Sequence, residues 1–252
     1  MFFAGCFMEA AVSRFYVYER LDFRFEDRDA LIVLPDGEQS GKWMVKTEYF
    51  GAFPGLELEL VSRGWCLAYL QNRNRWGTDE DSDAKARFCS FVAREFGLEN
   101  RFACVGMSCG GLCSINFAAK YPSRVSVLYL DAPVMNLLSC PMGFGVGEKL
   151  GGGSGWHEIE AALGFRSVSE LLVYRGHPMD RIGILAEHRI PVALVYGDAD
   201  VTVPYTENGV VLERLYREKG LPLFCAGKPG CGHHPHGLEN PKPLADFIEA
   251  WA

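Results

Sequence analysis

One serine of this sequence lies in a setting that could make its hydroxyl a nucleophile. Ser108 is the centre of Gly106-Met107-Ser108-Cys109-Gly110, which fits the pattern G-x-S-x-G. A short apolar run of the kind a buried strand makes precedes it, and small and apolar residues at helical spacing follow it. In such a sharp turn the serine is strained and exposed, and only glycine leaves room beside it. The alternative is a glycine-rich turn with an incidental serine.

Two later loops carry the acid and the base that a serine nucleophile needs. Asp198 and Asp200 directly follow one apolar run, and His233, His234 and His236 follow the next one. A serine hydroxyl is a poor nucleophile at neutral pH, so a histidine must take its proton and a carboxylate must orient that histidine. The groups occur in the order Ser, Asp, His, each just past a predicted strand.

The elements that must position these groups are strands that alternate with helices. This alternation predicts a parallel sheet covered on both faces, whereas the first two strands indicate an antiparallel edge. Ligands bind such sheets at the carboxyl ends of the strands, where all three candidate groups lie. The predicted strands are 15–25, 30–34, 42–46, 65–70, 102–106, 125–130, 191–196 and 222–226, and the predicted helices are 56–63, 83–96, 109–120, 205–219 and 241–251.

Three motifs in this order resemble those of the α/β-hydrolase superfamily. Gly106–Gly110 resembles its nucleophile elbow, Gly197–Pro204 its Gly-x-x-Asp-x-x-Val-Pro acid loop, and Cys231–Glu239 its Gly-His loop. The resemblance implies an α/β-hydrolase fold: a mostly parallel eight-stranded sheet, an antiparallel N-terminal edge, helices on both faces and a small lid insert over 134–187. Within the superfamily the chain looks similar to single-domain bacterial esterases and to the prolyl-oligopeptidase-like group.

The resemblance also assigns roles residue by residue. Ser108 would be the nucleophile, Asp200 the acid of the triad, and His233, which directly follows a glycine, the base. Asp198 would cap its own loop, and Asp131, after the preceding strand, is an alternative acid.

An oxyanion needs two hydrogen-bond donors beside the serine. The turn aims the amide N–H of Cys109 and the positive end of the following helix at the space where an oxyanion would form. The second donor should come from the loop after the third strand, where Glu48-Tyr49-Phe50-Gly51 replaces the usual His-Gly-x of the family. The Phe50 N–H is the predicted donor, with Tyr49 next. Glu48 is predicted among the substrate-binding residues, where it would orient a neighbouring arginine; the alternative is that it caps the loop.

Further residues are predicted to bind the substrate. Arg75 and Trp76 lie in a loop after a strand, and an arginine suits a carboxylate while an indole face suits a sugar ring. The alternative for this loop is a solvated segment with one packed tryptophan. His234 and His236 are expected on the substrate side of the base or in loop packing.

Neither a metal nor a cofactor is predicted. Cys231 and the three neighbouring histidines are residue types that bind zinc. However, all four lie within the segment 231–236, with no distant partner pair.

Composition limits the remaining functions. The chain of 252 residues is 48% hydrophobic and 23% charged, with no linker or repeat, which is typical of one globular domain, 1–252. A net charge of −7 argues against nucleic acid, and no apolar run is long enough to span a membrane. Nine cysteines scattered through apolar stretches give no disulfide framework, so a cytoplasmic location is expected.

The first residues permit a second interpretation. Phe3-Ala4-Gly5-Cys6 resembles the cleavage box of a bacterial lipoprotein, but no basic start or adequate apolar segment precedes it. The segment 1–12 is therefore expected to be an apolar arm that packs on the domain, with a trimmed lipoprotein as the alternative.

The sequence thus predicts a serine esterase that acts through an acyl-enzyme on a small polar or carbohydrate ester. Two alternatives stay open: a serine peptidase of the oligopeptidase type, and a ligand-binding module without turnover on a hydrolase scaffold.

Overall fold

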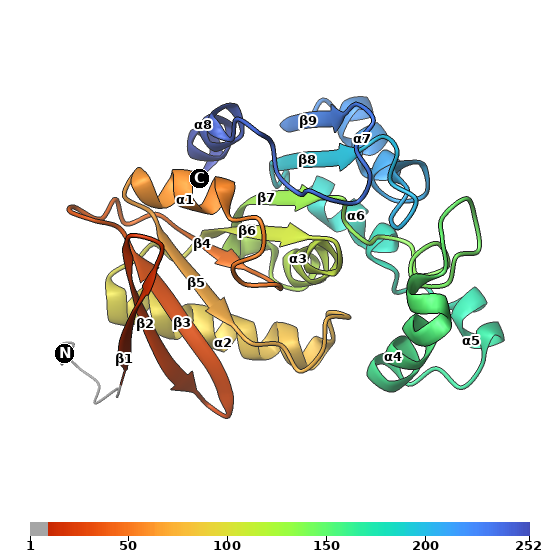
Figure 1. Cartoon of the computed structure of the whole chain (residues 1–252), viewed down its shortest axis with the longest axis horizontal. Coiled ribbons are helices and arrows are strands. Elements are labelled where there is room, and N and C mark those ends of the chain that lie inside the picture. Colours follow the sequence, from red (N-terminus) through yellow and green to blue (C-terminus); the bar gives the residue numbers. More distant parts are fainter. Residues whose placement is uncertain (1–9) are drawn as a thin grey trace.

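A single mixed sheet organises the protein. The computed structural model describes residues 10–252, and its nine strands follow the order β1-β2-β3-β5-β4-β6-β7-β8-β9. The strands from β1 through β3 to β5 pair antiparallel, and those from β5 through β4 to β9 pair parallel (Figure 1). The strands are β1 Ala11–Phe15, β2 Tyr18–Phe25, β3 Arg28–Leu34, β4 Trp43–Lys46, β5 Cys66–Leu70, β6 Phe102–Met107, β7 Val125–Asp131, β8 Val192–Gly197 and β9 Leu223–Lys228. The predicted sheet type, with its antiparallel N-terminal edge, is confirmed.

The described sheet has nine strands where eight were predicted. The predicted strand 15–25 is interrupted at Tyr16, whose φ of 56° reverses the chain between β1 and β2. Alternating side chains alone do not reveal such a turn, because the pattern continues on the second strand of the hairpin. Residues 1–9 of the predicted N-terminal arm lie outside the described part of the chain.

Helices cover both faces of the sheet, as predicted. α2, α3, α6 and α7 pack on one face and α1 and α8 on the other (Figure 1). Each of these faces is apolar because strands of a parallel sheet are buried on both sides. The helices are α1 Gly55–Ser62, α2 Asp79–Phe96, α3 Cys109–Lys120, α4 Ser154–Leu163, α5 Val168–Val173, α6 Pro178–Glu187, α7 Gly209–Glu218 and α8 Lys242–Trp251, with 3-10 turns η1 Pro122–Arg124, η2 Leu150–Gly153 and η3 Tyr205–Glu207.

α2 begins at Asp79 rather than at 83, because its first turn is stabilised by polar groups. The Thr78 hydroxyl accepts the Asp81 N–H at 3.3 Å, and three acidic residues occupy the positive end of the helix. The spacing of apolar residues does not reveal a turn that polar groups stabilise. The start predicted from this spacing was therefore too late.

The predicted insert 134–187 falls into two parts. α4 and α5 stand at one end of the molecule (Figure 1), and they pack against a separate apolar cluster that also includes Trp76 and residues at the start of α3. α6 instead packs Leu185 and Ala186 into the main core. The segment that stands apart from the layers of the sheet is therefore 134–177, which we call the cap.

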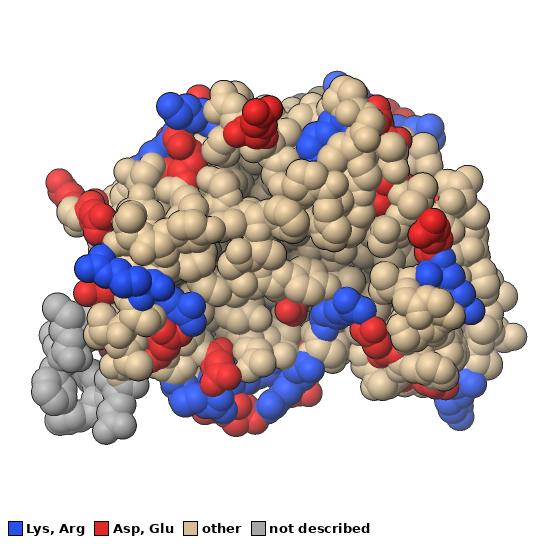
Figure 2. Space-filling view, viewed as in Figure 1, with Lys and Arg blue, Asp and Glu red and all other residues tan. Residues whose placement is uncertain are grey.

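Charged side chains on the face seen in Figure 2 lie mainly around its margin, with acidic and basic groups interspersed. This face therefore presents no continuous basic surface of the kind that nucleic acid requires. Among the described helices, none combines the length and the apolar character needed to cross a lipid bilayer.

Candidate active site

The turn after β6 holds Ser108 in a strained conformation. Its φ of 53° and ψ of −121° lie outside the usual regions for a side-chain-bearing residue. Gly106 makes the turn possible, because a Cβ at this position would lie 2.3 Å from the Gly110 carbonyl oxygen. Main-chain hydrogen bonds fix the serine: its N–H donates to the Asp131 carbonyl at 2.9 Å, and its own carbonyl accepts from Val134 at 3.1 Å.

Ser108, His233 and Asp200 form one hydrogen-bonded chain. His233 Nε2 lies 3.0 Å from Ser108 Oγ, and His233 Nδ1 lies 2.7 Å from Asp200 Oδ2. The three residues follow β6, β9 and β8, so the carboxyl edge of the sheet brings them together. The arrangement can transfer the serine proton to an oriented imidazole, which is the chemistry of a nucleophilic serine.

The surroundings keep Asp200 ionised. Burial favours the neutral acid, but hydrogen bonds from His233 and from the N–H groups of Thr202 and Val203 outweigh it and lower the pKa of this carboxyl. Asp198 was predicted to cap its own loop; its Oδ1 instead accepts the Gly230 N–H at 2.6 Å and so connects this loop to the one after β9.

Asp131, the alternative acid, contacts a different histidine. Its Oδ1 lies 2.9 Å from His236 Nδ1, and its Oδ2 accepts the Gly237 N–H at 2.5 Å and the Tyr129 hydroxyl at 3.0 Å. Burial favours the neutral acid here too, yet the hydrogen bond from His236 and the positive groups nearby lower the pKa of Asp131. This second carboxylate–imidazole pair was not predicted from the sequence, although Asp131 ends β7 and His236 follows β9 in the parallel sheet.

A cavity of about 380 Å³ opens above the serine. Three of the predicted substrate-side residues line it, namely Arg75, His234 and His236, and so do Tyr49 and Cys109. Ser108 and His233 line it as well. The other lining residues, which were not predicted as site residues, are Ala52, Phe53, Met107, Cys140, Leu150 and Thr202.

Among the predicted oxyanion donors, Cys109 and Tyr49 lie at this cavity. Cys109 is the first residue of α3, where an N–H has no partner within the helix. Burial raises the pKa of its thiol to about 11, so the thiol stays protonated. The Tyr49 N–H donates to Glu48 Oε1 at 3.2 Å, and Arg75 Nη1 donates to the Tyr49 hydroxyl oxygen at 3.5 Å. Burial, together with the neighbouring Cys109 thiol, also raises the pKa of this hydroxyl, so the hydroxyl stays protonated.

Phe50, the first choice for the second donor, is not among the residues that line the cavity. Its ring packs 4.9 Å from Phe15 and 5.5 Å from Tyr69, between ring centroids. The side chain of Phe50 thus packs against residues of β1 and β5 rather than at the cavity above the serine.

Trp76 is a packed residue rather than a surface for a sugar. It is 1% exposed within the apolar cluster of the cap, and its Nε1 donates to Glu158 Oε2 at 3.1 Å. The structure therefore favours the alternative of one packed tryptophan. Arg75 forms two hydrogen bonds with the same carboxylate, at 2.8 and 2.7 Å.

Glu48 caps its loop, in agreement with one of its two expected roles. Besides the Tyr49 N–H, its carboxylate accepts from Asn72 Nδ2 at 2.6 Å. The same amide group of Asn72 also donates to the Thr47 carbonyl at 2.7 Å, so this residue, which the sequence analysis did not single out, ties two loops together.

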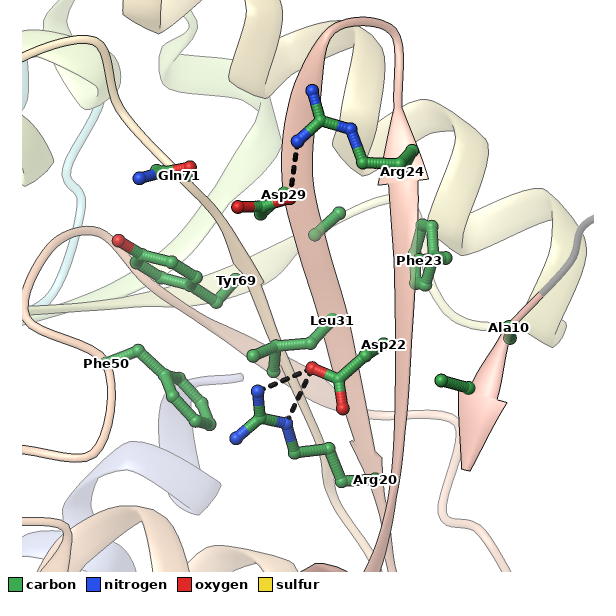
Figure 3. Close-up of a pocket in the computed structure, with 12 residues that line it drawn as sticks. Ala10, Arg20, Asp22, Phe23, Arg24, Asp29, Leu31, Phe50, Tyr69 and Gln71 are labelled. Atoms are coloured by element: carbon green, nitrogen blue, oxygen red, sulfur yellow. Dashed lines mark hydrogen bonds and ion pairs between the residues drawn. The ribbon is translucent and has the colours of Figure 1, made fainter. Parts of the chain in front are cut away.

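A larger cavity, of about 800 Å³, lies over the antiparallel edge and away from the serine. Figure 3 shows its ion pairs, Arg20 with Asp22 and Arg24 with Asp29, beside Phe50 and Tyr69. Its charges compensate each other, and no serine, cysteine or histidine is among the described residues that line it. This cavity therefore lacks the groups for nucleophilic hydrolysis.

Comparison with known proteins gives a family and a set of folds. The sequence from 64 to 251 matches the prolyl oligopeptidase family. Among curated proteins, no significant match to the sequence is found.

Solved structures with a similar fold include peptidases and an esterase. Dipeptidyl peptidase 4 of Porphyromonas gingivalis has 16% identity and a TM-score of 0.65, over 97% of this chain and 35% of that one. An acylaminoacyl peptidase of Pyrococcus horikoshii has 15% identity and a TM-score of 0.66, over 96% and 41%. An acetyl xylan esterase of Paenibacillus sp. R4 has 16% identity and a TM-score of 0.65, over 98% and 90%. The chain thus spans well under half of either peptidase, and the shared feature is the α/β-hydrolase fold.

Proposed function

The chain belongs to the prolyl oligopeptidase family of serine hydrolases, and we propose that it hydrolyses a carboxylic ester of a small polar or carbohydrate substrate through an acyl-enzyme on Ser108. The observation that carries this proposal is the continuous contact from Asp200 through His233 to Ser108, at 2.7 and 3.0 Å.

In the first half of the reaction, the Ser108 oxygen attacks the carbonyl carbon of the ester while its proton passes to His233 Nε2. Asp200 holds the Nδ1–H of His233 and stabilises the imidazolium that forms. When the tetrahedral intermediate collapses, the proton moves from Nε2 to the alkoxide, the alcohol leaves, and the acyl group stays on the serine.

In the second half, water repeats the attack on the acyl-enzyme. His233 Nε2 takes a proton from the water and returns it to Ser108 Oγ as the carboxylic acid leaves. In both halves the negative charge on the former carbonyl oxygen needs donors, and we assign these to the Cys109 N–H and the Tyr49 hydroxyl. The Tyr49 N–H is excluded from this role because it already donates to Glu48.

The side chains around the serine favour an ester over a peptide with a free amino group. An ammonium group bound near the scissile bond requires a carboxylate partner to compensate its desolvation. Among the described residues that line the cavity there is no aspartate or glutamate, whereas Arg75 is present. In addition, the solved structures with a similar fold include an acetyl xylan esterase.

The proposal is tested with short-chain nitrophenyl esters and a fluorophosphonate. We expect turnover of the acetate ester and stoichiometric labelling of Ser108, located by peptide mapping. Ser108→Ala should lower kcat by several orders of magnitude, about 10⁴-fold or more, because the nucleophile is removed. Thermal unfolding of the variant serves as the control for folding. Equal turnover by the native protein and Ser108→Ala would exclude the mechanism.

The same assay separates the two alternatives. Faster cleavage of proline-containing nitroanilides than of esters would assign the site to a peptidase, for which the family membership is the supporting observation. A folded native protein that neither labels nor turns over would be a ligand-binding module.

We also propose that the enzyme acts in a reducing compartment such as the cytoplasm, on a small substrate rather than on nucleic acid or a membrane. The supporting observation is that the eight cysteines within residues 10–252 are all unpaired, six of them buried.

A further inference from the structure

Three histidine rings meet beside Ser108 in an arrangement that fits a metal ion. The ring centroids of His233, His234 and His236 are 4.8, 4.8 and 4.9 Å apart, and the rings are inclined at 61 to 90° to one another. Nitrogen atoms of the three rings lie within 4.8 Å of one another. Three imidazoles on one tetrahedral Zn²⁺ ion, with Zn–N bonds of about 2 Å, would place their centroids about 5 Å apart. The triangle of ring centroids is therefore close to that of a three-histidine zinc site, and the nitrogens would approach one another to about 3.3 Å when the ion binds.

Distant carboxylates orient two of these rings in the way that zinc sites require. Asp200 holds Nδ1 of His233 and Asp131 holds Nδ1 of His236, at 2.7 and 2.9 Å. A carboxylate on Nδ1 leaves Nε2 as the metal-binding nitrogen and increases its basicity. From the sequence a metal was not expected, because the possible ligands had no distant pair of further ligands. The fold adds no such ligand pair, but the loops after β7 and β8 supply carboxylates that orient two of the histidines.

The remaining contacts also suit a metal. His234 stacks on Phe53, with 5.4 Å between ring centroids, and its nitrogens have no hydrogen bond to another described side chain at the site. Ser108 Oγ, 3.0 Å from His233 Nε2, lies where a fourth ligand or a metal-bound water would be. Three protein ligands with one open position are typical of zinc sites that exchange their fourth ligand.

We propose that His233, His234 and His236 bind one Zn²⁺ or a similar borderline divalent ion, and that the bound ion reversibly stops hydrolysis. The lone pair of His233 Nε2 forms the bond to the metal, so it no longer accepts the proton of Ser108. No bond to the substrate changes in this step, and removal of the ion by a chelator restores the base. The inhibition rests on the proposed function, whereas the binding does not.

Binding is measured without reference to activity, by titrating the chelator-treated full-length protein with Zn²⁺ in competition with a chromophoric chelator. We expect one Zn²⁺ per chain in the native protein and also in Ser108→Ala, which lacks turnover. His234→Gln should weaken binding by at least about tenfold, because one of three ligands is lost. His157→Gln is the matched control, since this exposed histidine on α4 lies outside the cluster. Its affinity for zinc should equal that of the native protein.

Spectroscopy with Co²⁺ in place of Zn²⁺ identifies the ligands. We expect visible bands of four-coordinate Co²⁺ without a thiolate charge-transfer band, because Cys231 is not among the proposed ligands. His234→Gln keeps both carboxylate–imidazole pairs, so its fold is preserved more safely than that of a variant at buried His236.

The outcomes separate this proposal from the proposed function. Absence of zinc binding by the native protein, a thiolate band, or equal affinity in His234→Gln would overturn the metal site. Binding with the expected ligands in a protein that has no esterase activity would leave the site standing and refute the function. Binding to an active enzyme whose turnover is unchanged at saturating zinc would refute the inhibition.

Discussion

At the residue scale, Asp200 is the best-defined member of the proposed triad. Its Oδ1 accepts two main-chain N–H groups at 2.8 Å each, and its Oδ2 faces His233 Nδ1. The main-chain bonds fix the carboxylate, so it can select the tautomer of His233 that leaves Nε2 free for the serine proton.

We therefore expect Asp200→Asn to reduce kcat on a nitrophenyl ester by about 10³- to 10⁴-fold, because an amide can stabilise the wrong tautomer of the histidine. Steady-state kinetics at saturating substrate measure this effect. Asp198→Asn is the control: Asp198 accepts only the Gly230 N–H, a bond that an asparagine oxygen also makes, so kcat should change little. Similar losses in both variants would contradict the assignment of Asp200.

Tyr49 allows a second prediction at this scale. The Tyr49→Phe variant keeps the ring but loses the hydroxyl, which we propose as an oxyanion donor because Tyr49 lines the cavity beside Ser108 and its hydroxyl oxygen accepts from Arg75. Loss of one such donor should lower kcat by about 10²- to 10³-fold with little change in KM. Tyr69→Phe, which changes a tyrosine that lines the other cavity, should leave both constants near their native values. A Tyr49→Phe enzyme with native kcat would assign the second donor to another group.

Sequence patterns predicted which loops form the site better than they predicted the contacts within those loops. The glycines around Ser108 and the positions of Asp200 and His233 after strands follow from local backbone requirements, which are visible in the sequence. The pairing of Asp131 with His236 was not foreseen because three histidines share one loop, and the sequence does not show which of them faces which carboxylate. Trp76 was misplaced because an aromatic side chain suits a binding surface and an apolar core equally well, and only packing decides between them.

At the element scale, one carboxylate of α4 connects the cap to the site. Glu158 accepts two hydrogen bonds from Arg75 and one from the buried Trp76. Arg75 lines the cavity over Ser108, so the position of α4 is coupled to the shape of that cavity.

We expect Glu158→Gln to raise KM by up to about fivefold while kcat falls less, because a partly exposed ion pair contributes about 1 kcal/mol or less. The side chains of Arg75 and Glu158 are 33% and 38% exposed, which places the pair in this range. Glu160→Gln on the same helix is the control, since Glu160 pairs only with exposed His157 at 3.4 Å. A fall in kcat with an unchanged KM would mean that Glu158 acts on the reaction rather than on the cavity.

The order and type of the helices and strands were largely predictable from the sequence. Where some of them end, and which part of the molecule they pack against, was not. The strands of the parallel sheet stand out as apolar runs between helices of clear periodicity. The hairpin at Tyr16 and the first turn of α2 depend on a single backbone angle and on polar capping, which an apolar pattern does not report. The place of α6 in the main core depends on tertiary packing with α3.

At the scale of the whole molecule, Asp131 fastens the C-terminal segment to the sheet. It lies at the end of β7 with a fully buried side chain, and two of its partners, His236 and Gly237, belong to the loop between β9 and α8. Since the same loop carries His233, the stability of this junction and the integrity of the site depend on one buried anion.

The pKa of this anion makes the stability of the fold dependent on pH. The pKa of Asp131 is lower in the folded state than the value of about 4 expected for an unfolded chain. Its contribution is therefore complete above about pH 4 and is lost as the pH falls through the lower, folded pKa.

Asp131→Asn should reduce the free energy of unfolding at pH 7 by about 1–3 kcal/mol, because the amide group cannot accept the hydrogen bonds of all three donors. Urea unfolding of both proteins between pH 7 and pH 3 should show a constant difference down to about pH 4 that shrinks below it. Asp246→Asn, at a carboxylate 68% exposed in an ion pair with Arg63, should change stability little at pH 7. A difference between native protein and Asp131→Asn that grows on acidification would mean that Asp131 stabilises the fold in its protonated form, contrary to the direction of its pKa.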